Sequence, residues 1–212
     1  MQSCSTEETV LQNDSDIKTV TMKNTLEIIA ILFLLLNFSC KAQSIVPLET
    51  RVNYHNSING IPETITYFKD INHLLDKYVG NWKGTYNDRN FEFIITKNTT
   101  IYDGLSEDRL LIRFLITTGT GTIIEDTRAE LDDKCSITGD YIENSYYALY
   151  YLGGNSQCGQ SGTVFITMVK NTNNSQMKLF LEQDHVLLPE VTCPNGRAAQ
   201  VLPLEQITLT KS

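Results

Sequence analysis

Residues 108–118 read DRLLIRFLITT, and this stretch decides the class of fold. Every second residue from Leu110 to Ile116 is apolar, and arginine and threonine occupy positions of the opposite set. A period of two predicts a strand with one buried face. Similar short segments follow one another along the chain: 82–86, 91–95, 146–152, 163–170, 177–184 and 206–211, with weaker ones at 120–126 and 137–143. Eight or nine short strands, joined by loops rich in Gly, Asn and Asp, predict an antiparallel barrel or sandwich.

One short helix is expected before these strands. Its apolar positions follow helical spacing and form a stripe of about two turns: Ile71, Leu74, Leu75 and Tyr78. Asp70 is placed to cap the start and Gly80 follows the end. Such a short helix is stable only when it packs against other elements.

The composition is that of a globular protein. The chain has 212 residues, of which 41% are hydrophobic and 20% charged, and its formal net charge is −8. This length suits one domain with a targeting segment. Because phosphate binding needs a cationic surface, the acidic balance argues against nucleic acid as a partner.

A single strongly apolar run predicts export. Residues 28–36 read IIAILFLLL, which as a helix spans only about 14 Å and is too short for a bilayer core of about 30 Å. Met22-Lys23 precedes the run and Ser39-Cys40 ends it, the order found in a secretory signal peptide. Residues 36–40, LNFSC, resemble a bacterial lipobox, and the residues that follow are similar to the start of small Bacteroidetes lipoproteins. The resemblance implies a lipid on Cys40; the alternative is a signal peptide with an incidental cysteine.

The chain therefore divides into four expected parts. Residues 1–21 are a mis-annotated start or a disordered extension, 22–39 a lipoprotein signal peptide, 40–66 the lipidated cysteine with a tether or loosely docked arm, and 67–212 the β domain. Without its first 39 residues the chain has a net charge of −5, which suits solubility rather than an electrostatic role. If flexible, the tether would reach about 25–30 Å from the membrane.

The Gly80-Asn81-Trp82 element, after a short helix and before a run of strands, resembles the lipocalin and calycin superfamily. The resemblance covers residues 70–211 and implies an antiparallel eight-stranded barrel, with Trp82 packed at the closed end. Gly139-Asp140-Tyr141 is similar to the second element of that family. The arginine that stacks on the tryptophan in that family has Arg197 as its nearest counterpart here.

Aromatic residues are the candidates for a ligand pocket, because their rings provide an apolar wall and Tyr adds a polar tip. The residues selected are Trp82, Tyr86, Phe91, Phe93, Tyr146 and Tyr150. The alternative is that these rings fill a small barrel and leave no cavity.

The cysteine count predicts one disulfide. With Cys4 outside the exported part and Cys40 acylated, three cysteines remain in an oxidising compartment. Cys158 and Cys193 both lie in loop-like sequence, so this pair is favoured. A bridge from Cys135 to either of them is the competitor.

No catalytic, metal or cofactor site is expected. Residues 158–162, CGQSG, faintly resemble a serine-protease nucleophile loop, but the chain has only three histidines and none stands in a recognisable catalytic context. Glu182, Asp184 and His185 lack further ligands for a metal site. A Gly/Ser turn and a solvated strand end are the simpler interpretations.

The sequence thus predicts a membrane-anchored envelope lipoprotein that binds a small apolar ligand or lipid in a β-barrel. The alternative is a structural or protein-interaction lipoprotein with a filled barrel, whose contacts lie in loops 153–162 and 189–200. Residues 41–44, KAQS, contain no acid, which favours the periplasmic side of the outer membrane over the cell surface.

Overall fold

The computed structural model describes residues 44–188 and 190–212. Within them the strands are β1 (Ser44–Pro47), β2 (Ile65–Lys69), β3 (Gly80–Tyr86), β4 (Arg89–Tyr102), β5 (Leu105–Thr118), β6 (Ile123–Asp126), β7 (Ile137–Glu143), β8 (Tyr146–Leu152), β9 (Ser161–Met168), β10 (Gln176–Gln183) and β11 (Ile207–Lys211). One short helix starts as a 3₁₀ turn at Leu48–Arg51 and continues as α2 (Val52–His55). Single 3₁₀ turns lie at Asp76–Tyr78, Asp132–Lys134 and Ser156–Cys158.

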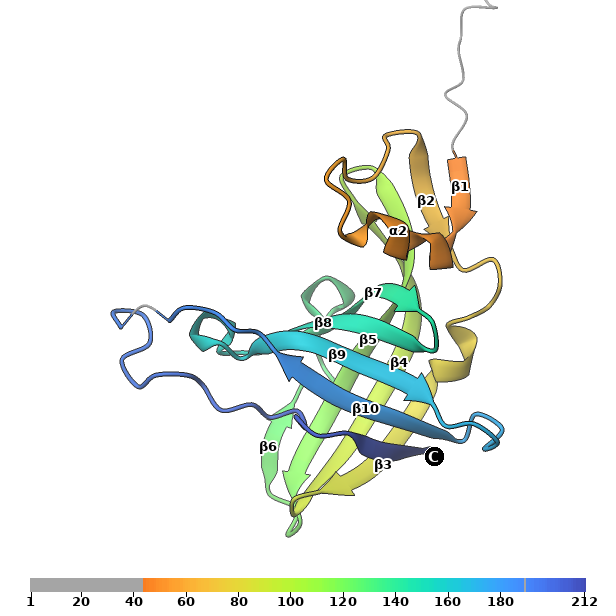
Figure 1. Ribbon diagram of the computed structural model, residues 1–212. Coiled ribbons are helices and arrows are strands. Elements are labelled where there is room, and N and C mark those ends of the chain that lie inside the picture. The colour runs from red at the N-terminus through yellow and green to blue at the C-terminus, as the bar shows by residue number, and fades with distance from the viewer. Residues whose placement is uncertain (1–43, 189) are drawn as a thin grey trace, which may run out of the picture. The chain divides into compact units, whose positions relative to one another are not determined.

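Eight of these strands form a closed antiparallel barrel (Figure 1), in the order β5-β4-β3-β11-β10-β9-β8-β7. The ring is closed where β7 pairs with β5 through Thr138 and Leu111 and through Ile137 and Ile112. The predicted all-β barrel is therefore confirmed. Closure leaves no unpaired edge in the ring, which is the usual way in which such sheets avoid edge-to-edge association.

The β4–β5 hairpin is the longest pairing in the barrel, with fourteen residue pairs from Arg89–Thr118 to Tyr102–Leu105. Its tight turn places Asp103 and Gly104 at positive φ, as a two-residue type I′ turn requires. The β3–β4 turn has the same geometry at Asn87 and Asp88. The four alternate apolar residues of 110–116 are fully buried, namely Leu110, Ile112, Phe114 and Ile116, and Leu111 of the opposite set is fully buried as well.

The core contains side chains from all eight barrel strands, so the axis of the barrel is occupied by protein. Its largest fully buried side chains are Trp82, Tyr78, Tyr147, Tyr151, Phe68, Phe93 and Phe114. In residues 146–152, which are apolar on both faces, Tyr147, Leu149 and Tyr151 are buried. Tyr150 and Leu152 alternate with them and are exposed.

The expected helix at 70–78 is wrong. Only Asp76–Tyr78 forms a 3₁₀ turn, and His73 has a φ of 53°. Asp70 does act as a cap, because its carboxylate accepts hydrogen bonds from the backbone N–H groups of Leu74 (2.7 Å) and Leu75 (3.1 Å). In this connection between Lys69 and Gly80, the left-handed backbone at His73 interrupts the helical conformation. Leu75 and Tyr78 are nevertheless buried.

The part of the expected tether that the structure describes is ordered and packed on the barrel. Strand β1 pairs in parallel with β2, and β2 pairs in parallel with β5 through Tyr67 and Phe68. Leu48, at the start of the short helix, is fully buried, as is Phe68. We call residues 44–69 the N-terminal arm (orange in Figure 1). Its packing is tertiary, which is why the local pattern suggested a loose segment.

Candidate functional site

A pocket of about 520 Å³ lies at one end of the barrel, which we call the mouth. It is formed where β3 ends, β4 begins and β10 ends, and residues 197–205 of the segment between β10 and β11 close one side. The lining residues are Tyr86, Asn87, Arg89, Phe91, Gln183, Arg197, Ala198, Ala199, Gln200, Val201, Leu202, Pro203, Leu204 and Glu205. The volume lies within the range of small-molecule sites.

Residues 190–206 between β10 and β11, which we call the wall segment, are held to the β8–β9 loop by a disulfide between Cys158 and Cys193, whose Cα atoms are 5.5 Å apart. This is the pair that the loop composition favoured, and Cys135 is a buried free thiol. Closing a loop of 35 residues stabilises the fold by about 3–4 kcal/mol in the chain-entropy account. The disulfide therefore fixes a segment that has no regular structure.

Hydrogen bonds around Gly159 position the wall segment more closely. The Gly159 carbonyl accepts from Gln200 Nε2 at 2.7 Å, and the Cys158 carbonyl accepts from the Ala198 N–H at 2.8 Å. Gln160 Nε2 donates back to the Ala199 carbonyl at 3.2 Å. Side chains and backbone of the β8–β9 loop thus replace the strand pairing that residues 197–200 lack.

The pocket combines an apolar floor with polar groups at its rim. Phe91 and Leu202 are buried there, and the ring of Phe91 lies 6.2 Å from that of Phe93 in the core. Arg89 Nη1 donates to the Val201 carbonyl at 3.4 Å. A hydrogen bond to Glu205 raises the pKa of Tyr86. An apolar base with a few oriented polar groups is the usual composition of a ligand site.

The structure separates the six predicted ligand residues into three places. Tyr86 and Phe91 line the mouth pocket, whereas Trp82 and Phe93 are fully buried core residues. Tyr146 and Tyr150 lie on the outer face of β8, because the alternate residues Tyr147, Leu149 and Tyr151 point into the core. The six therefore do not line one cavity.

Tyr146 belongs to an aromatic row across the outside of three adjacent strands. Its ring lies 5.3 Å from Phe165 on β9, which in turn lies 5.2 Å from Phe180 on β10. A shallow pocket of about 330 Å³ lies over this row. The hydroxyl of Tyr146 donates to Glu143 at 2.6 Å, and this bond raises the pKa of Tyr146 to about 12.

Trp82 has a structural role. Its Nε1 donates to the Tyr78 carbonyl at 2.7 Å, and Lys211 Nζ lies over its ring, 5.3 Å from the centroid. The cation on the tryptophan is thus Lys211 of β11, and the expectation for Arg197 is wrong. Arg197 instead donates to the carbonyls of Asp184 (2.9 Å) and Val186 (3.2 Å). The family resemblance asks for an arginine, and Lys differs from Arg in shape and hydrogen bonding. For this reason the resemblance did not indicate Lys211.

A buried charge cluster joins the N-terminal arm to the barrel, and sequence reasoning did not find it. Arg51 of the short helix lies 3.6 Å from Glu107 of β5 and 3.6 Å from Asp140 of β7. Both carboxylates are almost completely buried, and His55 Nδ1 lies 3.1 Å from Asp140 Oδ2. Burial raises the pKa of Glu107, although the Arg109 guanidinium at 2.6 Å opposes this shift. Charges that meet only through tertiary contact leave no local signal.

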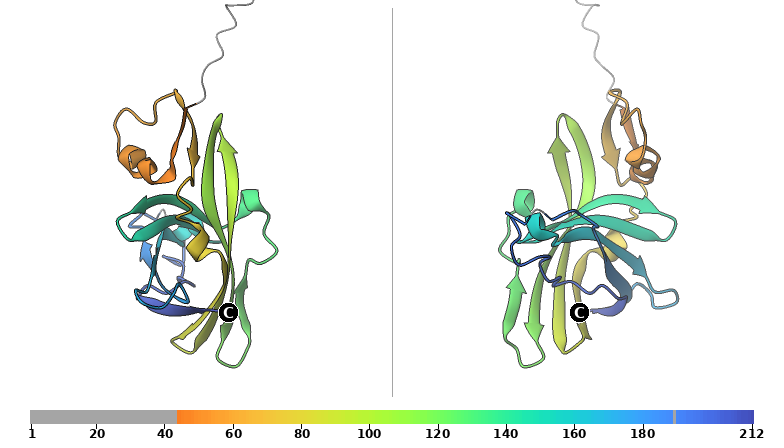
Figure 2. Two further views of the ribbon diagram at one scale, coloured as in Figure 1. Left: turned by 90° about the vertical axis from the view of Figure 1, so that its right-hand side faces the viewer. Right: turned by 60° about the vertical axis from the view of Figure 1, so that its left-hand side comes forward.

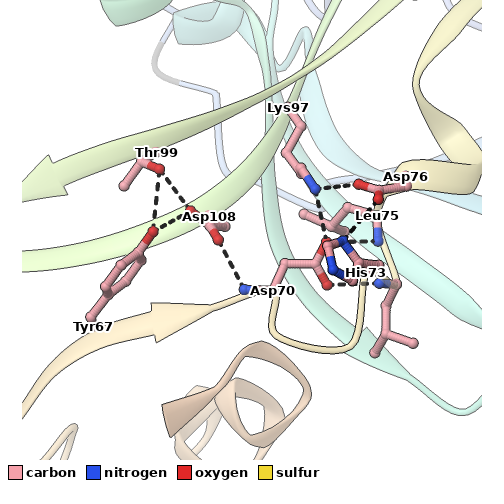
Figure 3. Close-up of polar contacts among 9 residues, drawn as sticks. Tyr67, Asp70, His73, Leu75, Asp76, Lys97, Thr99 and Asp108 are labelled. Carbon is pink, nitrogen blue, oxygen red and sulfur yellow. Dashed lines mark hydrogen bonds and ion pairs between the residues drawn. The ribbon is translucent and has the colours of Figure 1, made fainter. Parts of the chain in front are cut away.

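A second polar network fixes the link between the arm and β3 (Figure 3). Asp108 of β5 accepts hydrogen bonds from the Tyr67 hydroxyl (2.7 Å), the Thr99 hydroxyl (2.7 Å) and the Asp70 N–H (2.9 Å). Burial would raise the pKa of Asp108, but these three bonds outweigh it and lower the pKa. Lys97 bridges Asp70 and Asp76. The network therefore orders the connection that was expected to be a helix.

The residues tested for catalysis and metal binding have other partners. Ser161 donates to Asp184 at 2.8 Å, and the imidazoles of His55 and His73 face Asp140 and Asp76. Within residues 44–188 and 190–212, no group of three His, Cys, Asp or Glu side chains could hold a metal ion. Among the same residues, no helix has the length and apolar character to cross a membrane.

The fold and the mouth pocket define a small closed antiparallel β-barrel with a pocket of ligand size at a strand-end rim. Residues 22–211 match the model of the DUF6705 family, a family of unknown function. The chain belongs to this family. No curated protein and no solved structure matches it.

Proposed function

We propose that this protein is an exported, lipid-anchored envelope protein that binds a small, largely apolar molecule in the mouth pocket of a lipocalin-like barrel. The anchor is proposed at Cys40, from the signal at residues 22–40, and the location is the periplasmic face of the outer membrane. The pocket is the observation that carries the binding function, because it offers about 520 Å³ over the buried floor of Phe91 and Leu202.

The rim of the pocket defines the chemistry of the ligand further. A guanidinium has five N–H donors in a fixed planar arrangement. Among the described residues, Arg89 uses one of them, at 3.4 Å to the Val201 carbonyl. Arginine binds carboxylates in a bidentate manner. The proposed ligand is therefore an apolar body with one acidic group, which lies at Arg89.

Native mass spectrometry of the protein purified gently from bacterial envelope tests the binding function. The expected result is an additional mass of a few hundred daltons that is lost on denaturation. The variant Arg89→Gln should lose this mass, because the acidic group would have no charged partner. The matched variant Arg128→Gln changes an arginine whose side-chain partner among the described residues is Asp126, and should keep the additional mass.

A bare mass for the unmodified protein would contradict the binding function. It would instead support the second candidate, a protein-interaction lipoprotein with a filled barrel. The observation that favours this candidate is the exposure of Leu187 and Val191, which are 99% and 98% exposed in the segment between β10 and β11. Apolar side chains exposed on one loop can provide the anchors of a protein interface.

A further inference from the structure

The N-terminal arm and the tip of the β4–β5 hairpin lie side by side at one end of the structure. Ile61, Pro62 and Ile65 of the arm share a shallow pocket of about 340 Å³ with Tyr102 and Gly104 of the hairpin. Figure 2 shows the hairpin tip beside the orange arm in both views. We call the arm residues 58–65 and the hairpin residues 101–105 the apical surface.

The apical surface exposes large apolar side chains. Ile58 is fully exposed, Ile101 is 75% exposed and Tyr102 is 84% exposed. Ile58 lies in a turn of the arm, whereas Ile101 and Tyr102 end β4 beside the hairpin turn. Their exposed side chains do not contribute to the core of the barrel. Exposed apolar residues gathered on adjacent loops mark a contact with another surface.

The start of the arm is level with this surface. Ser44 pairs with Ile65 in the parallel β1–β2 ladder, and Tyr67 pairs with Ser106 in the parallel β2–β5 ladder. Two residues back along each strand, Ile65 is therefore level with Gly104 at the hairpin turn. Ser44 thus lies at the apical end, where the described chain begins.

Chain length then restricts the distance between this end and a membrane. From Cys40 to Ser44 there are four residue steps, which span at most about 14 Å when fully extended. This step rests on the proposed function, since it takes Cys40 as the lipid anchor. The ordered arm replaces the reach of about 25–30 Å that a flexible tether would have allowed.

We propose that the apical surface docks on the lipid bilayer, with Ile101 and Tyr102 in the interfacial region. Tyrosine is enriched at that depth because its ring is apolar and its hydroxyl is polar. The charged residues of the surface are Glu63 and Asp103, and neither would be attracted to anionic lipids. The bilayer that fits is therefore zwitterionic, and the mouth pocket faces away from it.

Fluorescence quenching in vesicles tests the docking. Full-length lipidated protein carrying Tyr102→Trp or Ile101→Trp is reconstituted into phosphatidylethanolamine–phosphatidylcholine vesicles with brominated acyl chains. The expected result is loss of emission from the introduced tryptophan, while buried Trp82 gives the unquenched background. The matched control is Ile123→Trp, at a residue that is 60% exposed and pairs with Thr117 of β5. Thr117 is eleven residues along β5 from Ser106, so the control site lies roughly 35 Å from the apical surface. It should not be quenched.

The outcomes separate the anchor from the docking. The loss of emission from Tyr102→Trp and Ile101→Trp could also be no greater than that from Ile123→Trp. In protein whose intact mass includes acyl chains, that result would overturn the docking and leave the anchor. Absence of acyl chains would overturn the anchor. The docking would then be decided with the same full-length variants carrying a polyhistidine tag inserted at residue 40, which holds them on vesicles that contain nickel-chelating lipid. A concentration-dependent dimer in solution that Tyr102→Ser abolishes would show that a second copy, rather than lipid, covers the surface.

Discussion

Asp108 illustrates how one carboxylate can determine a local conformation. Its two oxygens accept three hydrogen bonds, from Tyr67 on β2, from Thr99 on β4 and from the backbone N–H of Asp70. In turn, the Asp70 carboxylate holds the N–H groups of Leu74 and Leu75. Two acidic residues thus accept hydrogen bonds from three backbone N–H groups of the connection between β2 and β3, groups that a helix would satisfy in part by internal hydrogen bonds.

Replacing this carboxylate should remove a specific part of the acid stability. The pKa of Asp108 is lower in the folded protein, so the unfolded chain binds the proton more tightly. The stabilisation is present above the ordinary pKa of about 3.9 and is lost as the pH falls below it. Asp108→Asn should lower the free energy of unfolding by about 1–3 kcal/mol at pH 7, and less at pH 3. Urea titrations at the two pH values measure this; exposed Asp133→Asn should behave as the unmodified protein.

At the scale of elements, three kinds of contact hold the N-terminal arm to the barrel. Leu48 and Phe68 contribute apolar packing, β2 contributes two pairs with β5, and Arg51 contributes a charge between two buried carboxylates. The Arg51 guanidinium also lies 5.9 Å from the centre of the Phe68 ring. A strand pair of this size is marginal by itself, so the charge and the packing are needed to hold the arm.

Arg51→Met should therefore release the arm. The substitution keeps an apolar stem but leaves Glu107 and Asp140 buried without this partner, and we expect a loss of about 3 kcal/mol in unfolding free energy. Hydrogen–deuterium exchange should become faster in residues 44–69 and change little in β9 and β10. Arg128→Met removes a pair on the surface and should cost less than about 1 kcal/mol. Equal losses in the two variants would mean that the buried cluster does not hold the arm.

At the scale of the whole molecule, the barrel depends on the last strand. β11 pairs with β10 through four residues and with β3 through Thr210 and Lys211. It contributes Ile207 and Leu209 to the core and places Lys211 over Trp82. The final residues thus join β3 to β10, two strands that lie far apart in the chain.

A chain that ends at Leu204 should therefore fail to close. Its core would lack two side chains, and β3 and β10 would each present an unpaired edge. Urea titrations monitored by the emission of Trp82 should show no cooperative unfolding transition. Without denaturant, the tryptophan emission should already lie at long wavelength. A chain that ends at Lys211 lacks only Ser212 and should unfold cooperatively. A cooperative transition in the shorter chain would contradict this role of β11.

The alternation of apolar residues predicted strands of the barrel without help from tertiary structure. The segments expected at 82–86 and 108–118 lie within β3 and β5, because a period of two is that of an extended chain with one buried face. Burial of Trp82 and the pairing of Cys158 with Cys193 were also accessible from residue type and position.

Tertiary structure alone decided how the remaining residues are used. Leu75 and Tyr78 are buried as their spacing suggested. The helix that the spacing implied is nevertheless absent, and Asp70 instead donates its N–H to Asp108 and accepts a hydrogen bond from Lys97. The wall of the mouth pocket is a segment without periodicity, held by a disulfide and by Gly159. The arm is ordered by charges from three elements. Sequence patterns record contacts between near neighbours, whereas these features depend on residues that closure of the barrel brings together.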